Sequence, residues 1–274
     1  MPELPPAILA LDFDGVLCDG MREYFTASWR AWRSLRPSVA PDAPPGLFER
    51  FARVRPVVEN GWEMPLVIMA LLSGAPETEL LERWRPAPLL AGLGLTRAEL
   101  AAGVDRVRDE WIARDEADWL DHHRFYPGVV EKIRSLVGGP TRPVVVTTKE
   151  GRFARRILAR HGLELGDGNV YGKEARRPKP AILRALIDDA GPAPGSLWFV
   201  EDRLEALAAV TRAPGLDGVA LFLAAWGYNT PRDREAAHGD GRIALLSLER
   251  FVGDFSGWSA PDRAPDKASA PRRP

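Results

Sequence analysis

The chain has 274 residues, 45% of them apolar, which suits one sizeable domain or one domain carrying a large insertion. It carries 37 Lys and Arg against 38 Asp and Glu, so it lacks the basic surface typical of proteins that bind nucleic acid or an anionic membrane. Its single cysteine, Cys18, excludes an internal disulfide framework and fits a reducing compartment. A small molecule is therefore the expected partner.

Targeting signals are weak. Residues 1–6 lack the basic start and the long apolar core of a signal peptide. The most apolar run, residues 64–72, is far too short to cross a bilayer. These features predict a cytoplasmic protein that does not enter a membrane.

The first predicted element is a buried strand over residues 8–11, which runs directly into Asp12 and Asp14 before Gly15 releases the chain. Side chains alternate across a strand, so both carboxylates leave on the same side. Two buried like charges at this spacing need a cation or a shared proton between them. A solvated turn after a hydrophobic strand would give the same pattern, so this stretch alone leaves both interpretations open.

Residues 20–125 show helical periodicity and no convincing strand alternation, which predicts a helical insertion. The longest predicted helix begins at Thr96, which forms a capping box with Glu99. Proline-rich breaks, including Pro86 and Pro88, separate the helices. The expected helices span residues 21–34, 46–52, 65–72, 77–84 and 96–120.

From residue 126 onward helices and strands alternate, which predicts a parallel sheet covered by helices on both faces. After residue 253 the composition shifts to Ser, Ala, Pro, Asp and Arg, as in disordered tails. We therefore expect a core over residues 1–19 and 126–255, a helical cap over residues 20–125, and a disordered tail over residues 256–274. The expected strands after the first span residues 143–147, 169–171, 196–200 and 218–223.

Polar residues cluster where the predicted strands end, and ligands of open parallel sheets bind at those carboxyl ends. Hard oxygen ligands of this kind suit Mg²⁺ rather than zinc, and none of the four histidines has paired metal-ligand spacing. Lys179 arrives from the loop before a predicted helix. The residues at the strand ends are Asp12 and Asp14, Thr147 and Thr148, and Glu201 and Asp202.

Four short motifs in a fixed order resemble those of the haloacid dehalogenase superfamily. They are Asp12-Phe13-Asp14-Gly15-Val16, Val144-Val145-Val146-Thr147, Arg177-Pro178-Lys179-Pro180 and Phe199-Val200-Glu201-Asp202. The insertion after the first motif resembles the family's helical C1-type cap. Tyr126-Pro127-Gly128-Val129 and Trp226-Gly227-Tyr228-Asn229 resemble its phosphoglycolate phosphatase-like branch. The resemblance implies an α/β fold, with a Rossmann-like parallel sheet core of the superfamily's type and an inserted helical cap domain.

The resemblance also implies catalytic roles. Asp12 would attack phosphorus to form an aspartyl-phosphate, and a carboxylate is already ionised at neutral pH, so it needs no activating base. Asp14 would protonate the leaving oxygen and then activate water. Thr147 would hydrogen-bond a phosphoryl oxygen, and Lys179 would neutralise charge on the phosphoryl group and on Asp12.

Metal and substrate contacts follow from the same resemblance. Mg²⁺ would be held by Asp12, Asp202 and the backbone carbonyl of Asp14, with Glu201 and Glu205 as candidates for a further direct or water-mediated acid. Thr148 stands where relatives often have Asn, and its backbone N–H can still meet phosphate. In the expected cap, Arg22 and Arg55 are candidates for meeting a substrate carboxylate or a second anion.

The predicted function is a Mg²⁺-dependent phosphatase of a small phosphorylated metabolite. Because dehalogenases of the superfamily do not need an acid at the position of Asp14, its presence favours phosphoryl transfer over carbon–halogen cleavage. One alternative is a phosphomutase that resembles β-phosphoglucomutase, since the same motifs serve when the phosphoryl group returns to a sugar. An alternative of another class is a catalytically silent interaction or regulatory protein that keeps the fold.

Overall fold

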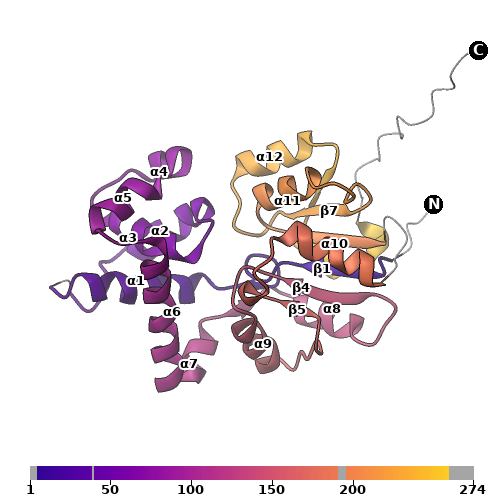
Figure 1. Ribbon diagram of the computed structural model, residues 1–274, viewed down its shortest axis with the longest axis horizontal. Coiled ribbons are helices and arrows are strands. Elements are labelled where there is room, and N and C mark those ends of the chain that lie inside the picture. The colour runs from indigo at the N-terminus through magenta and orange to yellow at the C-terminus, as the bar shows by residue number, and fades with distance from the viewer. Residues whose placement is uncertain (1–4, 39, 191–195, 259–274) are drawn as a thin grey trace, which may run out of the picture. The chain divides into compact units, whose positions relative to one another are not determined.

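The computed structural model describes residues 5–38, 40–190 and 196–258, and the chain divides into two compact units, coloured by sequence in Figure 1. The core unit comprises Met1–Leu17 and Tyr126–Pro274, and the cap unit comprises Cys18–Phe125. An antiparallel pair of short strands, β2 (Cys18–Asp19) and β3 (Arg124–Phe125), begins and ends the cap unit. This pairing places the boundary two residues earlier than the sequence suggests.

The core unit is built on a parallel sheet with strand order β5-β4-β1-β6-β7-β8, which confirms the predicted α/β fold class. β1 lies between β4 and β6, with Ala10 opposite both Val144 and Phe199. Its four residues are fully buried, as a strand covered on both faces requires. The strands are β1 (Ile8–Leu11), β4 (Arg142–Val146), β5 (Val170–Tyr171), β6 (Leu197–Glu201), β7 (Ala220–Ala224) and β8 (Ile243–Leu246).

β8 is absent from the sequence prediction. Its four residues form a short apolar run, and such a run cannot be assigned to a strand or a helix by periodicity alone. Its parallel pairing with β7, which sets Phe222 opposite Ala244, fixes it as a strand.

Core helices contribute apolar side chains to one buried cluster with the strands. Leu183 of α10 and Leu207 of α11 share this cluster with Phe199 of β6 and Leu221 of β7, so these two helices cover the sheet. The core helices are α8 (Val129–Leu136), α9 (Gly151–Arg160), η3 (Lys173–Ala175), α10 (Lys179–Ala190), α11 (Leu204–Thr211), α12 (Pro231–Gly239), α13 (Leu248–Val252) and η4 (Phe255–Gly257).

The end of the described chain is ordered further than its composition suggests. Residues 256–258 fall within the predicted disordered tail, yet they belong to η4 and to the buried Trp258 that follows it. The Trp258 ring packs 5.5 Å from that of Trp198 and 5.2 Å from that of Phe222, and burying so large an aromatic surface holds the segment in place. The rest of the predicted tail, residues 259–274, lies outside the described residues.

The cap unit is helical, with two departures from prediction. The helix expected over residues 96–120 is two helices, because Asp115 leaves helical geometry and its side chain accepts the backbone N–H of Asp118. α5 begins at Pro86, where proline was expected to break the chain, since a first helical turn tolerates proline. The elements are α1 (Met21–Leu35), α2 (Leu47–Val54), η1 (Arg55–Val57), η2 (Gly61–Glu63), α3 (Met64–Leu72), α4 (Glu77–Arg83), α5 (Pro86–Leu93), α6 (Arg97–Arg114) and α7 (Glu116–Asp121).

Among the described residues, none of the helices combines the length and the apolar character that crossing a membrane requires.

Candidate active site

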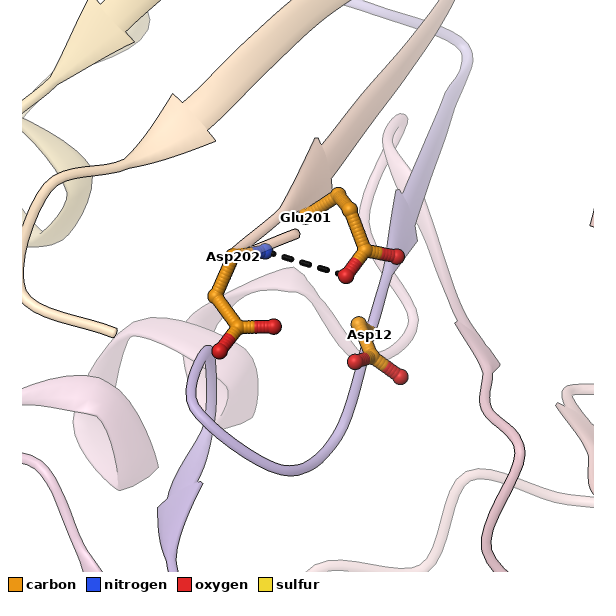
Figure 2. Close-up of side chains that lie close together, drawn as sticks. All are labelled: Asp12, Glu201 and Asp202. Carbon is orange, nitrogen blue, oxygen red and sulfur yellow. Dashed lines mark hydrogen bonds between the residues drawn. The ribbon is translucent and has the colours of Figure 1, made fainter. Parts of the chain in front are cut away.

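Three carboxylates meet at the carboxyl ends of β1 and β6. The Asp12 backbone N–H donates to the Val200 carbonyl at 2.9 Å, so the chain beyond β1 stays beside the end of β6, which delivers Glu201 and Asp202. Figure 2 shows the three side chains turned toward one shared space. One carboxylate oxygen from each lies within 4.8 Å of the others, and all three residues are buried. This group, Asp12, Glu201 and Asp202, is called the carboxylate cluster below.

Asp202 is held by backbone that approaches it closely. A Cβ at Gly15, whose φ is +84°, would collide with the Asp202 carboxylate, and a Cβ at Gly227 would collide with the Asp202 Cβ. Only glycine leaves this room. The Tyr228 backbone N–H donates to Asp202 Oδ2 at 2.7 Å, and Asn229 Nδ2 donates to the Asp202 carbonyl at 3.0 Å. The turn after β7 thus fixes the position of Asp202 at the end of β6.

Lys179, at the start of α10, joins two members of the carboxylate cluster. Its Nζ lies 3.0 Å from Asp12 Oδ1 and 2.6 Å from Glu201 Oε2. The other oxygen of Glu201, Oε1, accepts the backbone N–H groups of Asp202 and Arg203, each at 3.1 Å. Both oxygens of Glu201 are therefore engaged, and its contact with Lys179 directs the ammonium toward Asp12.

The buried charges shift one another's protonation. The pKa of Asp12 is raised to about 7, first by burial and then by the negative charge of Glu201, against the opposing effect of Lys179. Burial is also the main cause that raises the pKa of Glu201. For Lys179, burial disfavours the charged form, but attraction to Asp12 and Glu201 outweighs it and raises its pKa. Without a cation, Asp12 would therefore be only partly ionised at neutral pH.

A second ion pair lies at the end of β4. Lys149 Nζ is 3.2 Å from Asp14 Oδ1, with the two side chains only 6% and 12% exposed. Thr147 is buried, and its Oγ1 accepts the Lys149 backbone N–H at 3.1 Å, whereas Thr148 is exposed. Lys149 is not among the residues that the sequence predicts for the site. The available signal was its place two residues after Thr147, on the edge that carries Asp14.

The other predicted residues are not members of the carboxylate cluster. Glu205 is 64% exposed and pairs with Arg203 at 3.6 Å, so Glu201 is the candidate acid that lies within the cluster. Arg22 is exposed on α1. Arg55 is buried inside the cap unit, where its Nη1 donates to the Val58 carbonyl at 3.0 Å. A role of either arginine toward substrate stays a prediction.

The donor set fits a hard divalent cation. The three buried carboxylates of the carboxylate cluster lie around the Lys179 ammonium, which contacts Asp12 and Glu201. A surplus of negative charge at this depth is unfavourable unless protons or a cation balance it, and the raised pKa of Asp12 shows the proton alternative. Carboxylate oxygens are the ligands that Mg²⁺ and Ca²⁺ prefer.

Comparison with known proteins identifies the family to which the chain belongs. Residues 6–213 match the family of haloacid dehalogenase-like hydrolases, which covers both the strand ends and the insertion described above. The chain belongs to that family. It is therefore a hydrolase with this fold, and the resemblance predicted from the four motifs is confirmed.

Relatives with assigned activities are moderately similar. A phosphoglycolate phosphatase of Rhodospirillum rubrum is 29% identical over 187 residues, which cover 62% of this chain and 73% of the relative. A 5'-nucleotidase of Pseudomonas aeruginosa is 28% identical over 184 residues, which cover 65% of this chain and 80% of the relative. A crystal structure described as a predicted phosphoglycolate phosphatase from Haemophilus somnus superposes with a TM-score of 0.58 at 18% identity, covering 91% of this chain and 95% of that one, and shares the fold.

Proposed function

We propose that the protein is a Mg²⁺-dependent phosphatase that hydrolyses a small phosphorylated metabolite through an aspartyl-phosphate on Asp12. The observation that carries this proposal is the buried carboxylate cluster with Lys179 in contact with Asp12 and Glu201. The names of the relatives, a phosphoglycolate phosphatase and a 5'-nucleotidase, support a phosphate ester as the substrate.

The proposed first step is attack by Asp12. One of its carboxylate oxygens forms a bond to phosphorus while the bond from phosphorus to the leaving oxygen breaks. Asp14 donates a proton to the leaving oxygen, which departs as a neutral hydroxyl. Lys179, 3.0 Å from Asp12, neutralises charge on the nucleophile and on the transferred group, and the Thr147 hydroxyl donates a hydrogen bond to a phosphoryl oxygen.

The second step releases phosphate. Asp14 accepts a proton from a water molecule, whose oxygen attacks phosphorus and frees the Asp12 carboxylate. Lys149, 3.2 Å from Asp14, holds this carboxylate in one orientation during both proton transfers. Asp14 therefore ends the cycle in the protonation state in which it began.

Asp12 and Asp202 are the proposed side-chain ligands of Mg²⁺, with the Asp14 carbonyl as a backbone ligand. Glu201 lies in the same cluster, but its three hydrogen-bonded contacts suit it better to positioning Lys179 than to direct ligation. When bound, Mg²⁺ supplies positive charge that offsets the repulsion between an anionic nucleophile and an anionic substrate. It also keeps Asp12 ionised at a pH where its pKa of about 7 would otherwise leave it half protonated.

Phosphate release from a panel of phosphorylated metabolites tests the proposal directly. We expect turnover of at least one metabolite with Mg²⁺, loss of turnover with EDTA, and recovery when Mg²⁺ is returned in excess. Equal turnover with and without EDTA would exclude the metal-dependent mechanism. Analysis of the organic product distinguishes hydrolysis from isomerisation, because a phosphomutase would return an isomeric sugar phosphate without free phosphate.

A further inference from the structure

A hollow of about 370 Å³ in the core unit is lined entirely by charged residues. Its volume is within the range of small-molecule sites. The lining contains two more cationic than anionic side chains, so the hollow carries a surplus of positive charge. The lining residues, called the basic hollow below, are Glu150, Arg152, Arg155, Lys173, Glu174 and Arg176.

Two segments of the core unit form the basic hollow. One is Glu150 with the first turns of α9, and the other is η3 with Arg176 after it, between β5 and α10. They touch through backbone, because a Cβ at Gly172 would collide with the backbone of Gly151. The Lys173 N–H also donates to the Lys149 carbonyl at 2.9 Å. Backbone contacts therefore hold the two sides of the hollow together.

The two carboxylates of the lining are already engaged. Glu150 accepts from Arg152 Nε at 2.5 Å. Glu174 accepts the Gly151 backbone N–H at 2.9 Å and lies 3.7 Å from Arg155. These contacts hold Arg152 and Arg155 beside the acidic groups, and the other cationic side chains of the lining are Lys173 and Arg176.

Arg176 holds an unfavourable backbone conformation at this place. Its φ is +49°, and it is the one non-glycine residue with positive φ in the part of the chain that the structure describes. A left-handed conformation is disfavoured for a residue with a Cβ, and such conformations gather at functional sites. Glycine or asparagine would form the same turn at lower cost, so an exposed arginine here indicates a use for its side chain.

The geometry points to an anion-binding site in the basic hollow, which takes a phosphate or carboxylate group through Lys173 and Arg176, with Arg152 and Arg155 beside them. The anion has two conceivable sources, a separate small anion or a second anionic group on the substrate. The second source rests on the proposed function, because the same two stretches of chain also carry residues of the active site, Lys149 before the hollow and Lys179 at the start of α10. The site itself does not depend on turnover.

The whole protein is titrated with inorganic phosphate in EDTA. Binding is monitored through the NMR chemical shifts of the backbone amides. We expect saturable shifts over residues 150–155 and 173–176. In the double variant Lys173→Gln, Arg176→Asn these shifts should need about tenfold more phosphate, as loss of charged hydrogen bonds predicts. Asparagine tolerates positive φ, which protects the fold. Arg212→Gln, an exposed charge on α11's end outside the hollow, should bind as the unchanged protein does.

Two results would overturn the site: no saturable shift in the hollow, or shifts that the double variant leaves unchanged. Steady-state kinetics then identify the source. If the hollow binds a second anionic group of the substrate, the double variant should raise KM for such a substrate about tenfold without lowering kcat. Its KM for a singly phosphorylated neutral alcohol should stay unchanged. A separate-anion site predicts unchanged KM for both. Absence of any turnover would contradict the proposed function but would leave the NMR result standing.

Discussion

Each unit of the molecule buries a group of charges, and the two groups differ in balance. In the cap unit, Glu23 accepts from Arg108 through Nε at 2.7 Å and Nη2 at 3.2 Å, and from Trp119 Nε1 at 3.4 Å. Asp105 Oδ1 lies 3.7 Å from Arg108 Nη1, and attraction to Glu23 outweighs burial to raise the pKa of Arg108. In the core unit, the three carboxylates of the carboxylate cluster lie around Lys179, and burial raises the pKa of Asp12 to about 7.

The difference separates a structural ion pair from a reactive site. A matched, bidentate pair has its charges satisfied within the fold, so removing one partner should mainly affect stability. A cluster of buried carboxylates favours the binding of a cation and of a charged substrate, so removing one carboxylate should mainly lower the turnover rate. The comparison predicts that variants in the two groups will change different measured quantities.

Asp12→Asn should have the largest effect. It removes the proposed nucleophile, so kcat should fall by at least about a thousandfold, while the free energy of unfolding in EDTA should stay level or rise because one repelling charge is gone. Phosphate release and urea unfolding measure the two quantities. A variant with near-normal turnover would remove Asp12 from the role of nucleophile.

Glu23→Gln should have the opposite profile. It leaves the Arg108 charge buried without a full partner, which costs about 3–5 kcal/mol in free energy of unfolding. The double variant Glu23→Gln, Arg108→Met should recover part of this loss, because it removes the stranded charge as well. Urea unfolding of the four proteins in the cycle checks both statements. If the single variant unfolds like the unchanged protein, the matched pair contributes nothing to stability.

Strand positions were readable from the sequence because buried strands of a parallel sheet are short apolar runs that end in polar residues. β1, β4 and β6 are followed by Asp12, Thr147 and Asp202, whereas β8 is a four-residue apolar run before Ser247 that periodicity alone cannot assign to a strand. The break at Asp115 was missed because an amphipathic pattern continues through it, and only the capping contact to Asp118 separates α6 from α7. Local capping overrides periodicity here.

Within the site, the sequence pointed to the residues and to the pairing of Lys179 with Asp12, but not to the other contacts. The four motifs named Asp12, Lys179 and Asp202, which the fold brings to one edge of the sheet. It could not assign Glu201 to Lys179, because that contact depends on how the start of α10 meets the end of β6. Nor could it find Lys149, whose side chain turns toward Asp14 only in the folded chain.

Lys149→Met tests whether an ion pair of the core unit takes part in the reaction, since Lys149 and Asp14 form a pair of equal and opposite charge there. If Lys149 orients Asp14 for proton transfer, kcat should fall about ten- to a hundredfold with little change in KM. Stability should change by less than in Glu23→Gln. Lys132→Met serves as the control for kcat, because it alters a half-buried lysine of α8 whose Nζ donates to the Gly253 carbonyl rather than to Asp14. Unchanged kcat in Lys149→Met would show that the ion pair has no part in the reaction.

The pH dependence of the free energy of unfolding should show the smallest effect, but it tests the carboxylate cluster most specifically. With its pKa near 7, folded Asp12 keeps a proton between about pH 4 and pH 7 that the unfolded chain has already released. In EDTA, this group therefore makes the protein less stable as pH rises through that window, and adds no further slope above it. Mg²⁺ needs the ionised carboxylates, so its stabilising effect should grow over the same window. Urea unfolding from pH 5 to pH 8 should give curves with and without Mg²⁺ that diverge as pH rises. Asp12→Asn should remove most of this divergence, and parallel curves in the unchanged protein would mean that Asp12 does not couple protons to the metal.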